Sequence, residues 1–234
     1  MYEGKSILAV VPARSGSKGI VNKNMYKLGD TSLIGLAGKC LNQIPWIDKK
    51  IISTDSEDYM QEGNRYFLDA PFKRTPELSS DSAGAIETIR HALIEAERIY
   101  RTSFDIVLIV EPTSPLREPE DIIKAIRLLV ESGVDSVVTV SPLITKYHPA
   151  KILAMQNDFL YFYESRGAKI VNRQSLEKLY WRNGICYVLT RDCLISKKAI
   201  FTDKTIPLII EREIVNIDDP IELKWAEFLL EIKY

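Results

Sequence analysis

Apolar and polar positions along this chain follow two alternating patterns. Short, continuous apolar runs such as 7–11 and 105–110 have the length and β-branched content of strands that are covered on both faces. The stretches between them carry apolar residues at every third or fourth position, as in 119–132, which is typical of helices with one buried face. The repeated order of strand, loop and helix predicts an α/β fold with a doubly wound, mostly parallel sheet.

The same patterns place the individual elements. Strands are predicted at 7–11, 50–54, 105–110, 136–140, 184–189 and 214–217, with a weak one at 70–73. Helices are predicted at 33–43, 56–65, 83–100 and 119–132, and a final helix is expected to begin at Pro220. Ser32 and Ser56 are expected to cap the first two helices, and Asp81 or Ser82 the third.

The regular alternation of predicted strands and helices is interrupted between residues 145 and 182. Runs 151–155 and 159–163 flank a short polar turn and predict a hairpin. We therefore expect a single domain over 1–234 with an inserted arm at about 145–182. The hairpin carries more apolar residues than a two-stranded ribbon can cover alone, which predicts that the arm reaches a second copy in a homodimer.

A cationic, glycine-containing loop follows the first strand. Arg14, Lys18 and Lys23 lie close together there, and Gly16 and Gly19 permit backbone geometries that are closed to other residues. Converging backbone N–H groups and cations favour a phosphate site over a solvated loop. The spacing fits neither G-x-x-x-x-G-K-[ST] nor G-x-G-x-x-G, which disfavours two familiar nucleotide-binding folds.

The amino-acid composition limits the classes of partner and of bound metal that are expected. The 234 residues include 31 Lys and Arg against 32 Asp and Glu, so the net charge is −1 and no global field attracts nucleic acid or an anionic membrane. Cys40, Cys186 and Cys193 are odd in number and widely spaced, which argues against a disulfide framework or a zinc site. No apolar run is long enough to span a bilayer or serve as a signal peptide, and we expect a cytoplasmic protein.

Two carboxylates stand next to each other before the final helix. Asp218 and Asp219 follow the predicted strand 214–217. One reading is a helix cap, a role that Asp fills well. The other is a magnesium ligand, because a hard cation prefers carboxylate oxygens and a bound triphosphate supplies the rest. The cationic loop at the same sheet edge favours the metal.

Taken together, these motifs resemble the cytidylyltransferases that activate sialic acids, including the CMP-N-acetylneuraminate and CMP-legionaminate synthetases. The resemblance spans nearly the whole chain, and it is carried by Arg14-x-x-Ser17-Lys18-Gly19, Lys23-Asn24, Arg74-x-Pro76-Glu77-Leu78-x-x-Asp81, Pro112-Thr113-Ser114-Pro115-Leu116-Arg117, Asn183-Gly184 and Ile217-Asp218. It implies a nucleotide-diphospho-sugar transferase type of fold. It also implies a reaction in which CTP and a nine-carbon 2-keto-3-deoxy sugar acid give the CMP-sugar and pyrophosphate, with Mg²⁺ as cofactor.

The resemblance also implies roles for individual residues. The residues expected to hold the triphosphate and the metal include the catalytic set Arg14, Lys18, Lys23 and Asp218, together with Ser17, Gly19 and a second metal-site residue, Asn216. The residues expected at cytosine and ribose are Asn24, Arg74, Asp81 and Ser82. The residues expected at the sugar acid are Glu111, Thr113, Ser114, Lys151, Arg173 and Asn183.

Three positions depart from the family pattern. Glu111 stands where sialate-activating members commonly carry Gln, so an amide that could donate becomes an acceptor. Asn216 stands where relatives can show a first metal-binding Asp, which leaves Asp218 as the main ligand. Trp181-Arg182-Asn183-Gly184 stands where the family shows an Arg-Pro-Asn-Gly order, so Trp181 replaces the Arg and Arg182 replaces the Pro. The first and third bear on the identity of the sugar, and the second on the number of metal ions.

Two alternatives stay open from the sequence. One is transfer to another sugar acid such as the eight-carbon Kdo, or to a sugar phosphate, although residues 20–24 fit the sialate branch better than the Kdo branch. The other is a nucleotide-binding module that has lost catalysis. Retention of Arg14, Lys18, Lys23 and Asp218 argues against this module, whereas Asn216 favours it slightly.

Overall fold

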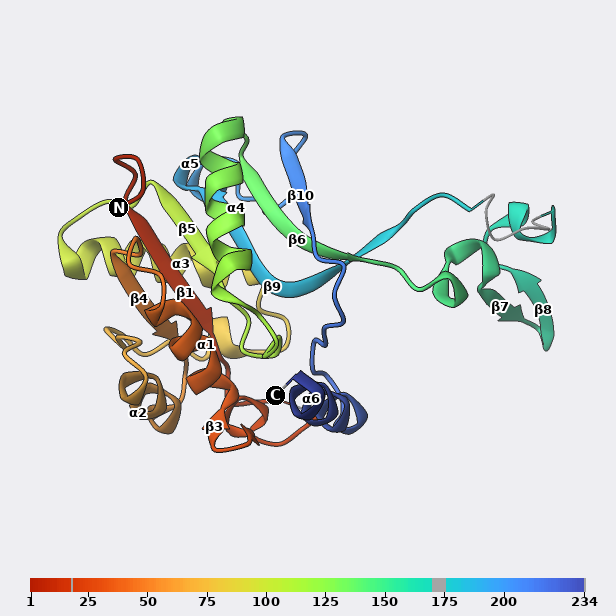
Figure 1. The fold of residues 1–234 in the computed structure, drawn as a ribbon, viewed down its shortest axis with the longest axis horizontal. Helices are drawn as coiled ribbons and strands as arrows, with labels where there is room; N and C mark the ends of the chain where they lie inside the picture. The colour runs from red at the N-terminus through yellow and green to blue at the C-terminus, as the bar shows by residue number, and fades with distance from the viewer. Residues whose placement is uncertain (18, 170–175, 234) are drawn as a thin grey trace.

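The computed structural model describes residues 1–17, 19–169 and 176–233. Within these ranges a six-stranded sheet forms the centre of the molecule, with strands in the order β10-β6-β9-β5-β1-β4 (Figure 1). Its strands are β1 (Ile7–Pro12), β4 (Lys49–Ser53), β5 (Ile106–Ile109), β6 (Ser136–Pro142), β9 (Tyr180–Thr190) and β10 (Thr205–Ile209). A two-stranded piece, β2 (Lys27–Leu28) with β3 (Thr31–Ser32), lies outside it.

The sheet is mostly parallel, as the sequence predicted. β1 pairs in parallel with β4 on one side and β5 on the other, and β10 pairs in parallel with β6. The exception is β9, which runs antiparallel between β5 and β6. The carboxyl ends of β1, β4 and β5 therefore meet at one edge of the sheet, which is where ligands bind in open α/β folds.

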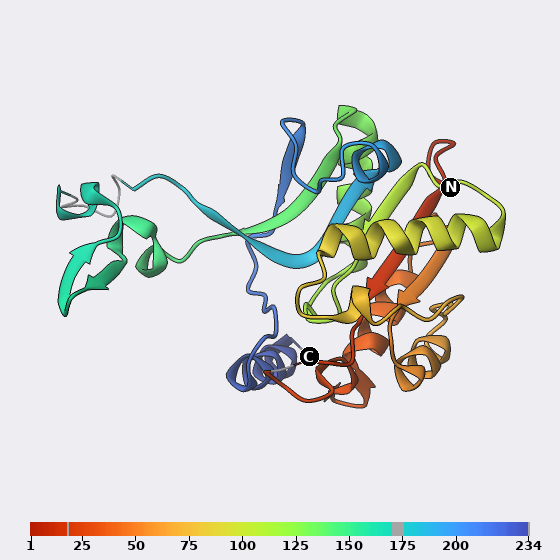
Figure 2. The same ribbon diagram turned by 180° about the vertical axis from the view of Figure 1, so that it is seen from behind.

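Helices cover both faces of the sheet. Buried residues of α1 (Leu33–Asn42) and α4 (Pro119–Ser132) share one core with α2 (Glu57–Arg65). Those of α3 (Ala85–Tyr100) and α5 (Arg191–Ile195) form the core on the other face. Figure 1 shows α1 and α4 in front of the sheet, and Figure 2 shows α3, in yellow, across its back. This arrangement confirms the predicted α/β class.

Helix boundaries agree with the predicted caps at two of three positions. The hydroxyl of Ser32 accepts a hydrogen bond from Gly35 N, and that of Ser56 accepts one from Tyr59 N. The third prediction is wrong, because α3 begins at Ala85 with Gly84 at its N-cap, beyond both Asp81 and Ser82. Those two residues belong to the loop that precedes the helix.

Some predicted strands are wrong, and others were missed. Residues 214–217 are not a strand, because Val215 and Ile217 pack against α6 (Pro220–Lys233) instead of pairing in the sheet. The weak strand at 70–73 is also absent, although Asp69 forms an isolated bridge with Ile51. The unpredicted β10 contains Pro207, which is tolerated because an edge strand leaves one side unpaired. The short α5 was missed as well.

The arm leaves the sheet between β6 and β9. It contains the predicted hairpin, formed by β7 (Leu153–Gln156) and β8 (Phe159–Phe162). Its bounds differ from the prediction, since residues 180–182 belong to β9 and the arm spans 143–179. Figure 1 shows it extending well away from the sheet. No helix in the described ranges is both long and apolar enough to cross a membrane.

Candidate active site

A cavity lies at the carboxyl edge of the sheet, where the loops after β1 and β5 meet the segment before α3. It measures about 300 Å³. Four of the predicted site residues line it, and they come from three separate parts of the chain: Arg14, Arg74 with Asp81, and Glu111. Arg182 and Tyr187 of β9 complete the lining on the side of the antiparallel strand. The fold therefore brings together residues from widely separated parts of the chain, from the end of β1 to β9.

The loop after β1 is held by the loop after β4. Asp55 accepts hydrogen bonds from Ser15 N (2.9 Å) and from the Ser15 hydroxyl (2.8 Å). Although partial burial opposes the shift, these bonds hold the pKa of the Asp55 carboxyl below its ordinary value. Asn24 Nδ2 donates to the carbonyl of Arg14 (3.2 Å), and Ser17 N donates to the carbonyl of Ser15 (3.0 Å). The loop is thus fixed from both sides.

The far end of this loop meets Asp218. Lys23 Nζ donates to the Ile217 carbonyl (2.7 Å) and to Asp218 Oδ1 (2.8 Å). A Cβ at Gly19 would lie 2.5 Å from the Asp218 carbonyl oxygen, so only glycine fits this approach. Gly19, Lys23 and Asp218 are therefore neighbours, as the sequence predicted for a phosphate and metal site. Lys18 lies outside the described residues.

The neighbouring Asp219, and not Asp218, caps the final helix. Asp219 Oδ1 accepts hydrogen bonds from Ile221 N (2.9 Å) and Glu222 N (3.1 Å). Glu222 Oε2 in turn accepts from the backbone N–H groups of Asp218 (2.6 Å) and Asp219 (3.0 Å). The cap is complete without the Asp218 carboxylate, which is 79% exposed and contacts Lys23. This separation of roles favours the metal reading of Asp218.

Arg74 fixes the opposite side of the cavity. Its Nε donates to the Ser53 hydroxyl (3.2 Å), and its Nη2 donates to the Ser53 carbonyl. Burial lowers the pKa of the Arg74 guanidinium to about 10, so the side chain stays charged near neutral pH. Arg14 forms an ion pair with Asp81 (2.9 Å), which joins the first loop to the loop before α3. The hydroxyl of Ser82 lies 3.1 Å from that of Ser80.

Glu111 forms a polar group with residues of two other segments. Burial raises the pKa of its carboxyl, against the opposing effect of a hydrogen bond with Tyr187. Asn216 Nδ2 donates to Glu111 Oε2 (3.4 Å), while the buried Oδ1 of Asn216 has no hydrogen-bond partner among the described residues. Gly184, at a φ of +70°, lies against Glu111 so closely that a Cβ would collide with the carboxylate.

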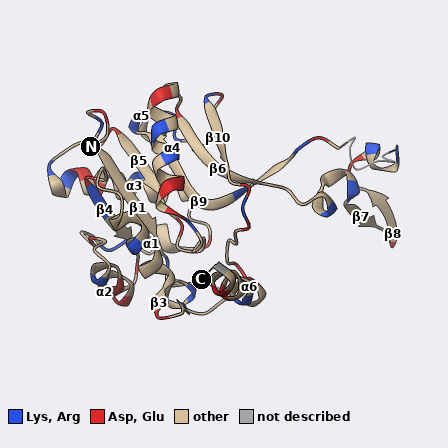
Figure 3. Ribbon diagram, in the orientation of Figure 1, with Lys and Arg blue, Asp and Glu red and all other residues tan. Residues whose placement is uncertain are grey.

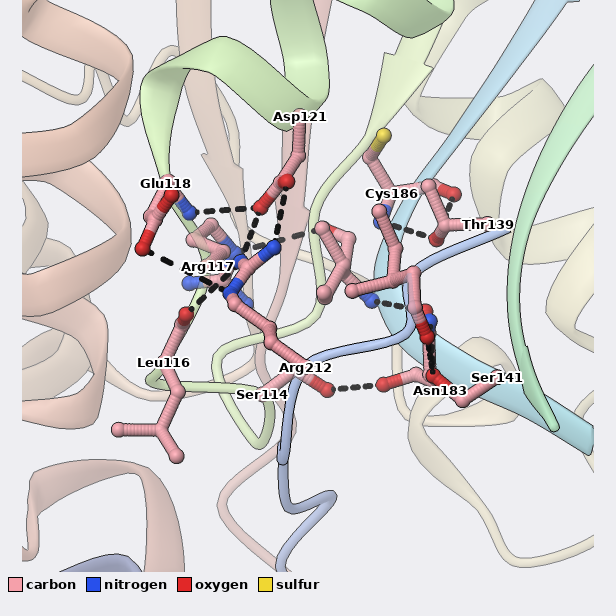
Figure 4. Close-up of polar contacts among 12 residues, drawn as sticks. Ser114, Leu116, Arg117, Glu118, Asp121, Thr139, Ser141, Asn183, Cys186 and Arg212 are labelled. Atoms are coloured by element: carbon pink, nitrogen blue, oxygen red, sulfur yellow. Dashed lines mark hydrogen bonds and ion pairs between the residues drawn. The ribbon is translucent and has the colours of Figure 1, made fainter. Parts of the chain in front are cut away.

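Ser114 and Asn183 lie in a buried chain of hydrogen bonds beneath this group. The Ser114 hydroxyl donates to the Asn183 carbonyl (2.6 Å), and Asn183 Nδ2 donates to the Ser141 hydroxyl (3.1 Å; Figure 4). The Thr113 carbonyl accepts a hydrogen bond from Ile217 N (2.8 Å). These contacts fix the loop after β5 against β9 and the segment before α6. The direct sugar contact predicted for Thr113, Ser114 and Asn183 stays a prediction.

The two remaining sugar-site candidates belong to the arm. Lys151 ends the 3-10 turn Pro149–Lys151, just before β7, and the arm carries it away from the cavity of its own chain. Arg173 lies outside the described residues. The structure therefore does not bring Lys151 together with the other candidates within one chain.

Sequence reasoning missed several residues of the site. Asp55, Arg182 and Arg117 were not singled out, although Asp55 directly follows a predicted strand at the carboxyl edge and could have been found from its position. Arg117 was seen only as part of a motif. It is buried, and it donates to the carbonyl of Glu111 and to that of Ile185 (3.3 Å), so it holds the loop after β5 from inside.

The donor set agrees with a hard cation that takes most of its ligands from a substrate. In the part of the chain that the structure describes, no group of three or more His, Cys, Asp or Glu residues could hold a metal by itself. Asp218 offers an exposed carboxylate, and Asn216 offers a buried, unpartnered amide oxygen two residues earlier. Mg²⁺ is commonly bound by one or two protein oxygens together with phosphate oxygens and water. These residues fit that requirement.

Comparison with solved structures supports the fold. A structure described as CMP:2-keto-3-deoxy-manno-octonic acid synthetase in complex with CTP aligns over 98% of this chain and 100% of its own, with a TM-score of 0.70 and 12% identity. At this identity the likeness shows the fold alone. The chain therefore shares the α/β fold of that structure, and its cavity lies at the sheet edge where ligands bind in open α/β folds.

Comparison of sequences identifies the family. Residues 8–229 match the family model described as cytidylyltransferase, so the chain belongs to the cytidylyltransferase family and is a nucleotidyltransferase. The "Post-translational flagellin modification protein B" of Campylobacter coli is 30% identical over 97% of this chain and 96% of its own length. The "CMP-N,N'-diacetyllegionaminic acid synthase" of Legionella pneumophila is 30% identical over 97% of both chains. The predicted family resemblance is confirmed.

Proposed function

We propose that this enzyme activates a nine-carbon 2-keto-3-deoxy sugar acid, of sialic or legionaminic type, with CTP to give the CMP-sugar and pyrophosphate. The observation that carries the proposal is the position of the Lys23–Asp218 pair beside the phosphate loop, at the edge of the sheet where Arg14 and Arg74 line the cavity. The similarity over nearly the full chain to a synthase of a CMP-legionaminic acid supports the choice of sugar class.

The proposed mechanism needs positioning and charge more than covalent chemistry. The anomeric hydroxyl of the sugar acid attacks the α-phosphorus of CTP and gives up its proton to solvent. The bond between the α-phosphorus and the oxygen that bridges to the β-phosphate breaks, and pyrophosphate leaves with that oxygen. Arg14 and Lys23 neutralise charge on the triphosphate as the leaving group develops. Arg74, held by Ser53, and Asn24, held by the Arg14 carbonyl, shape the cytosine side of the cavity.

Glu111 is the residue proposed to meet the sugar in this chain. It lines the cavity next to Tyr187 and Arg182, and its carboxylate can only accept hydrogen bonds when it is ionised. Asp218 and Asn216 are proposed to hold Mg²⁺, which when bound supplies positive charge to the phosphate oxygens. The carboxylate of the sugar acid is proposed to bind Lys151 and Arg173 of a partner's arm.

The first prediction tests nucleotide and sugar together. We expect pyrophosphate release with CTP to exceed release with UTP, ATP or GTP at equal concentration, because Arg74 and Asn24 are held in fixed positions beside the cavity. Across a panel of sugar acids, nine-carbon acids are expected to be used and Kdo poorly. The measurement is the initial rate of pyrophosphate release.

Three results of this panel would contradict the proposal. Equal use of UTP and CTP would remove the assigned base selectivity. A preference for Kdo would favour the alternative substrate, whose synthetase shares the fold. CTP binding without turnover of any acid would favour a nucleotide-binding module that has lost catalysis.

We also propose a homodimer formed through the arm. The hairpin exposes large apolar side chains on both strands and beyond: Leu153, Met155, Phe159, Leu160, Tyr161, Phe162 and Tyr163. A ribbon of two strands does not hide such a surface alone, and a second copy would cover it. The same contact would carry Lys151 toward the partner's sugar site.

The second prediction concerns this dimer. Replacing Phe159 and Leu160 with serine is expected to yield monomers, because both side chains are exposed on β8 and contribute no buried core to their own chain. Sedimentation gives the oligomeric state, and the Michaelis constant for the sugar acid is expected to rise more than that for CTP. A wild-type protein that sediments as a fully active monomer would exclude the arm as an intersubunit element.

The proposed location is the cytoplasm. Cys40, Cys186 and Cys193 are all free and buried, which fits a reducing compartment in which CTP is available. The net charge of −1 supports small-molecule substrates as partners in preference to nucleic acid or a membrane surface.

A further inference from the structure

The segment 210–218 connects β10 to α6 and carries both proposed metal-site residues. It is not a strand, so no sheet ladder holds it along its length. Near its ends, Ile210 N donates to the Val140 carbonyl (2.8 Å) and Ile217 N donates to the Thr113 carbonyl (2.8 Å). Between these two points, Arg212 makes the strongest polar contacts of the segment.

Arg212 joins this segment to the start of α4. Its Nη1 donates to Asp121 Oδ1 (2.8 Å), and its Nη2 donates to Asp121 Oδ2, so the guanidinium forms two parallel bonds with one carboxylate. Nη2 also donates to the Leu116 carbonyl (3.2 Å), and Nε lies 3.6 Å from Glu118 Oε1. Figure 4 shows Arg212 reaching all three partners from the segment that leads to α6.

Asp121 does not need Arg212 to start its helix. Its Oδ2 already accepts a hydrogen bond from Glu118 N (2.8 Å), and the two residues form a capping box. The Asp121 side chain is only 7% exposed, and a buried carboxylate is costly unless a cation pairs with it. The pair therefore fixes the distance between the loop after β5, which carries Glu111 and Thr113, and the segment that carries Asn216 and Asp218.

We propose that Arg212 and Asp121 are positioning residues for the nucleotidyl transfer. They hold segment 210–218 at a fixed position relative to the loop after β5. In this position Asn216 and Asp218 contact the metal–triphosphate while Glu111 faces the sugar. This inference rests on the proposed function. Neither residue touches the reacting atoms, and both act through the place they give to Asp218.

The chain offers a matched control at the opposite edge of the sheet. Arg191 forms two parallel bonds with Glu97 (2.8 and 2.9 Å), and Glu97 Oε1 also accepts from Phe104 N (3.1 Å). Side-chain exposures are 43% and 14% for Arg191 and Glu97, and 31% and 7% for Arg212 and Asp121. Arg191 N donates to the Asp105 carbonyl, at the amino end of β5 and away from the cavity.

The experiment compares Arg212→Gln, Arg212→Lys and Arg191→Gln with the wild-type enzyme. Both Gln variants are expected to lose similar stability in urea unfolding. Only Arg212→Gln is expected to raise the half-saturating Mg²⁺ concentration. It is also expected to lower kcat by about 10- to 100-fold, because a small displacement of segment 210–218 disturbs the alignment of the reacting groups. Arg212→Lys keeps the positive charge but cannot form two parallel hydrogen bonds with one carboxylate. Its kcat and half-saturating Mg²⁺ concentration are expected to lie between those of the wild type and Arg212→Gln.

Two further measurements do not depend on turnover. Mn²⁺ binding in the presence of CTP, followed by electron paramagnetic resonance, is expected to weaken in Arg212→Gln and not in Arg191→Gln. Hydrogen exchange at the Ile217 amide is expected to speed up in Arg212→Gln alone. That N–H donates a hydrogen bond to the Thr113 carbonyl, which links segment 210–218 to the loop after β5. If Arg212→Gln fails to fold, Arg212→Lys carries the same comparison.

The outcomes separate this inference from the proposed function. Equal effects of Arg212→Gln and Arg191→Gln on Mn²⁺–CTP binding and on exchange at Ile217 would overturn the positioning role. A wild-type protein that releases no pyrophosphate would refute the proposed function, and the same two binding and exchange measurements would still decide the role of Arg212.

Discussion

Replacing Lys23 with alanine is expected to lower kcat by about 10²- to 10³-fold, the effect of removing one charge-assisted contact to a developing anion. Lys23 Nζ lies at the point where the phosphate loop meets Asp218 and the Ile217 carbonyl. Its side chain is 12% exposed, so the charge is partly shielded from water and acts more strongly on a bound phosphate than a surface lysine would. The measurement is the rate of pyrophosphate release with saturating CTP and sugar acid.

Stability serves as the control for this variant. The partner Asp218 is 79% exposed, and a pair of this kind contributes at most about 1 kcal/mol to folding. We therefore expect a small change in melting temperature, and Lys27→Ala, a change of an exposed lysine in β2, is expected to leave turnover unaltered. An unchanged melting temperature together with near-normal turnover of Lys23→Ala would refute the catalytic role.

Replacing Asp218 with asparagine is expected to abolish measurable turnover and to weaken the dependence of the rate on Mg²⁺. The change keeps a side-chain oxygen but removes the charged ligand proposed for Mg²⁺. Asn216, two residues earlier, is already neutral. Because Asp219 caps α6, Asp218→Asn is expected to leave the free energy of unfolding nearly unchanged. Titrating Mg²⁺ against rate, with urea unfolding alongside, provides both measurements.

Asp219→Ala is the matched control for Asp218→Asn and should show the reverse behaviour. It removes the acceptor of two helix N–H groups, so a loss of about 1 kcal/mol in stability is expected while Mg²⁺ dependence is retained. Asn216→Asp replaces the amide that donates to Glu111 with a second carboxylate, so it is expected to lower stability without Mg²⁺ and to be tolerated or to tighten metal binding with Mg²⁺ present. If Asp218→Asn keeps wild-type turnover and loses only stability, the metal assignment is wrong.

The cationic loop after β1, residues 14–24, is a local feature that the sequence could predict. The run 7–11 has no polar position, and Gly16, Gly19 and the cations follow at once, so a buried strand opening into a cationic loop could be predicted without a fold. The helices were predicted almost to the residue where Ser32 and Ser56 cap them, since capping involves atoms only three residues apart.

The segment 214–217 shows where the same reasoning fails. Its apolar residues are those of a buried strand, and burial is what the structure provides: Ile214, Val215 and Ile217 are all nearly inaccessible. What covers Val215 and Ile217 differs, because α6 and the loop after β5 take the place of a neighbouring strand. Apolar content predicts that a segment is buried, whereas the choice between sheet pairing and packing depends on partners that are remote in sequence.

The sequence by itself determined the fold class, the family and the place of the cationic loop after β1, since each depends on periodicity or on short motifs that are local along the chain. Only the tertiary structure decided that Asp218 meets Lys23, 195 residues away, which leaves Asp219 as the cap of α6, and that Arg212 pairs with Asp121, 91 residues away. The physical reason is that ion pairs depend on distances of about 3 Å. Such distances between remote residues are set by how the sheet and its helices pack, and no spacing along the chain records them.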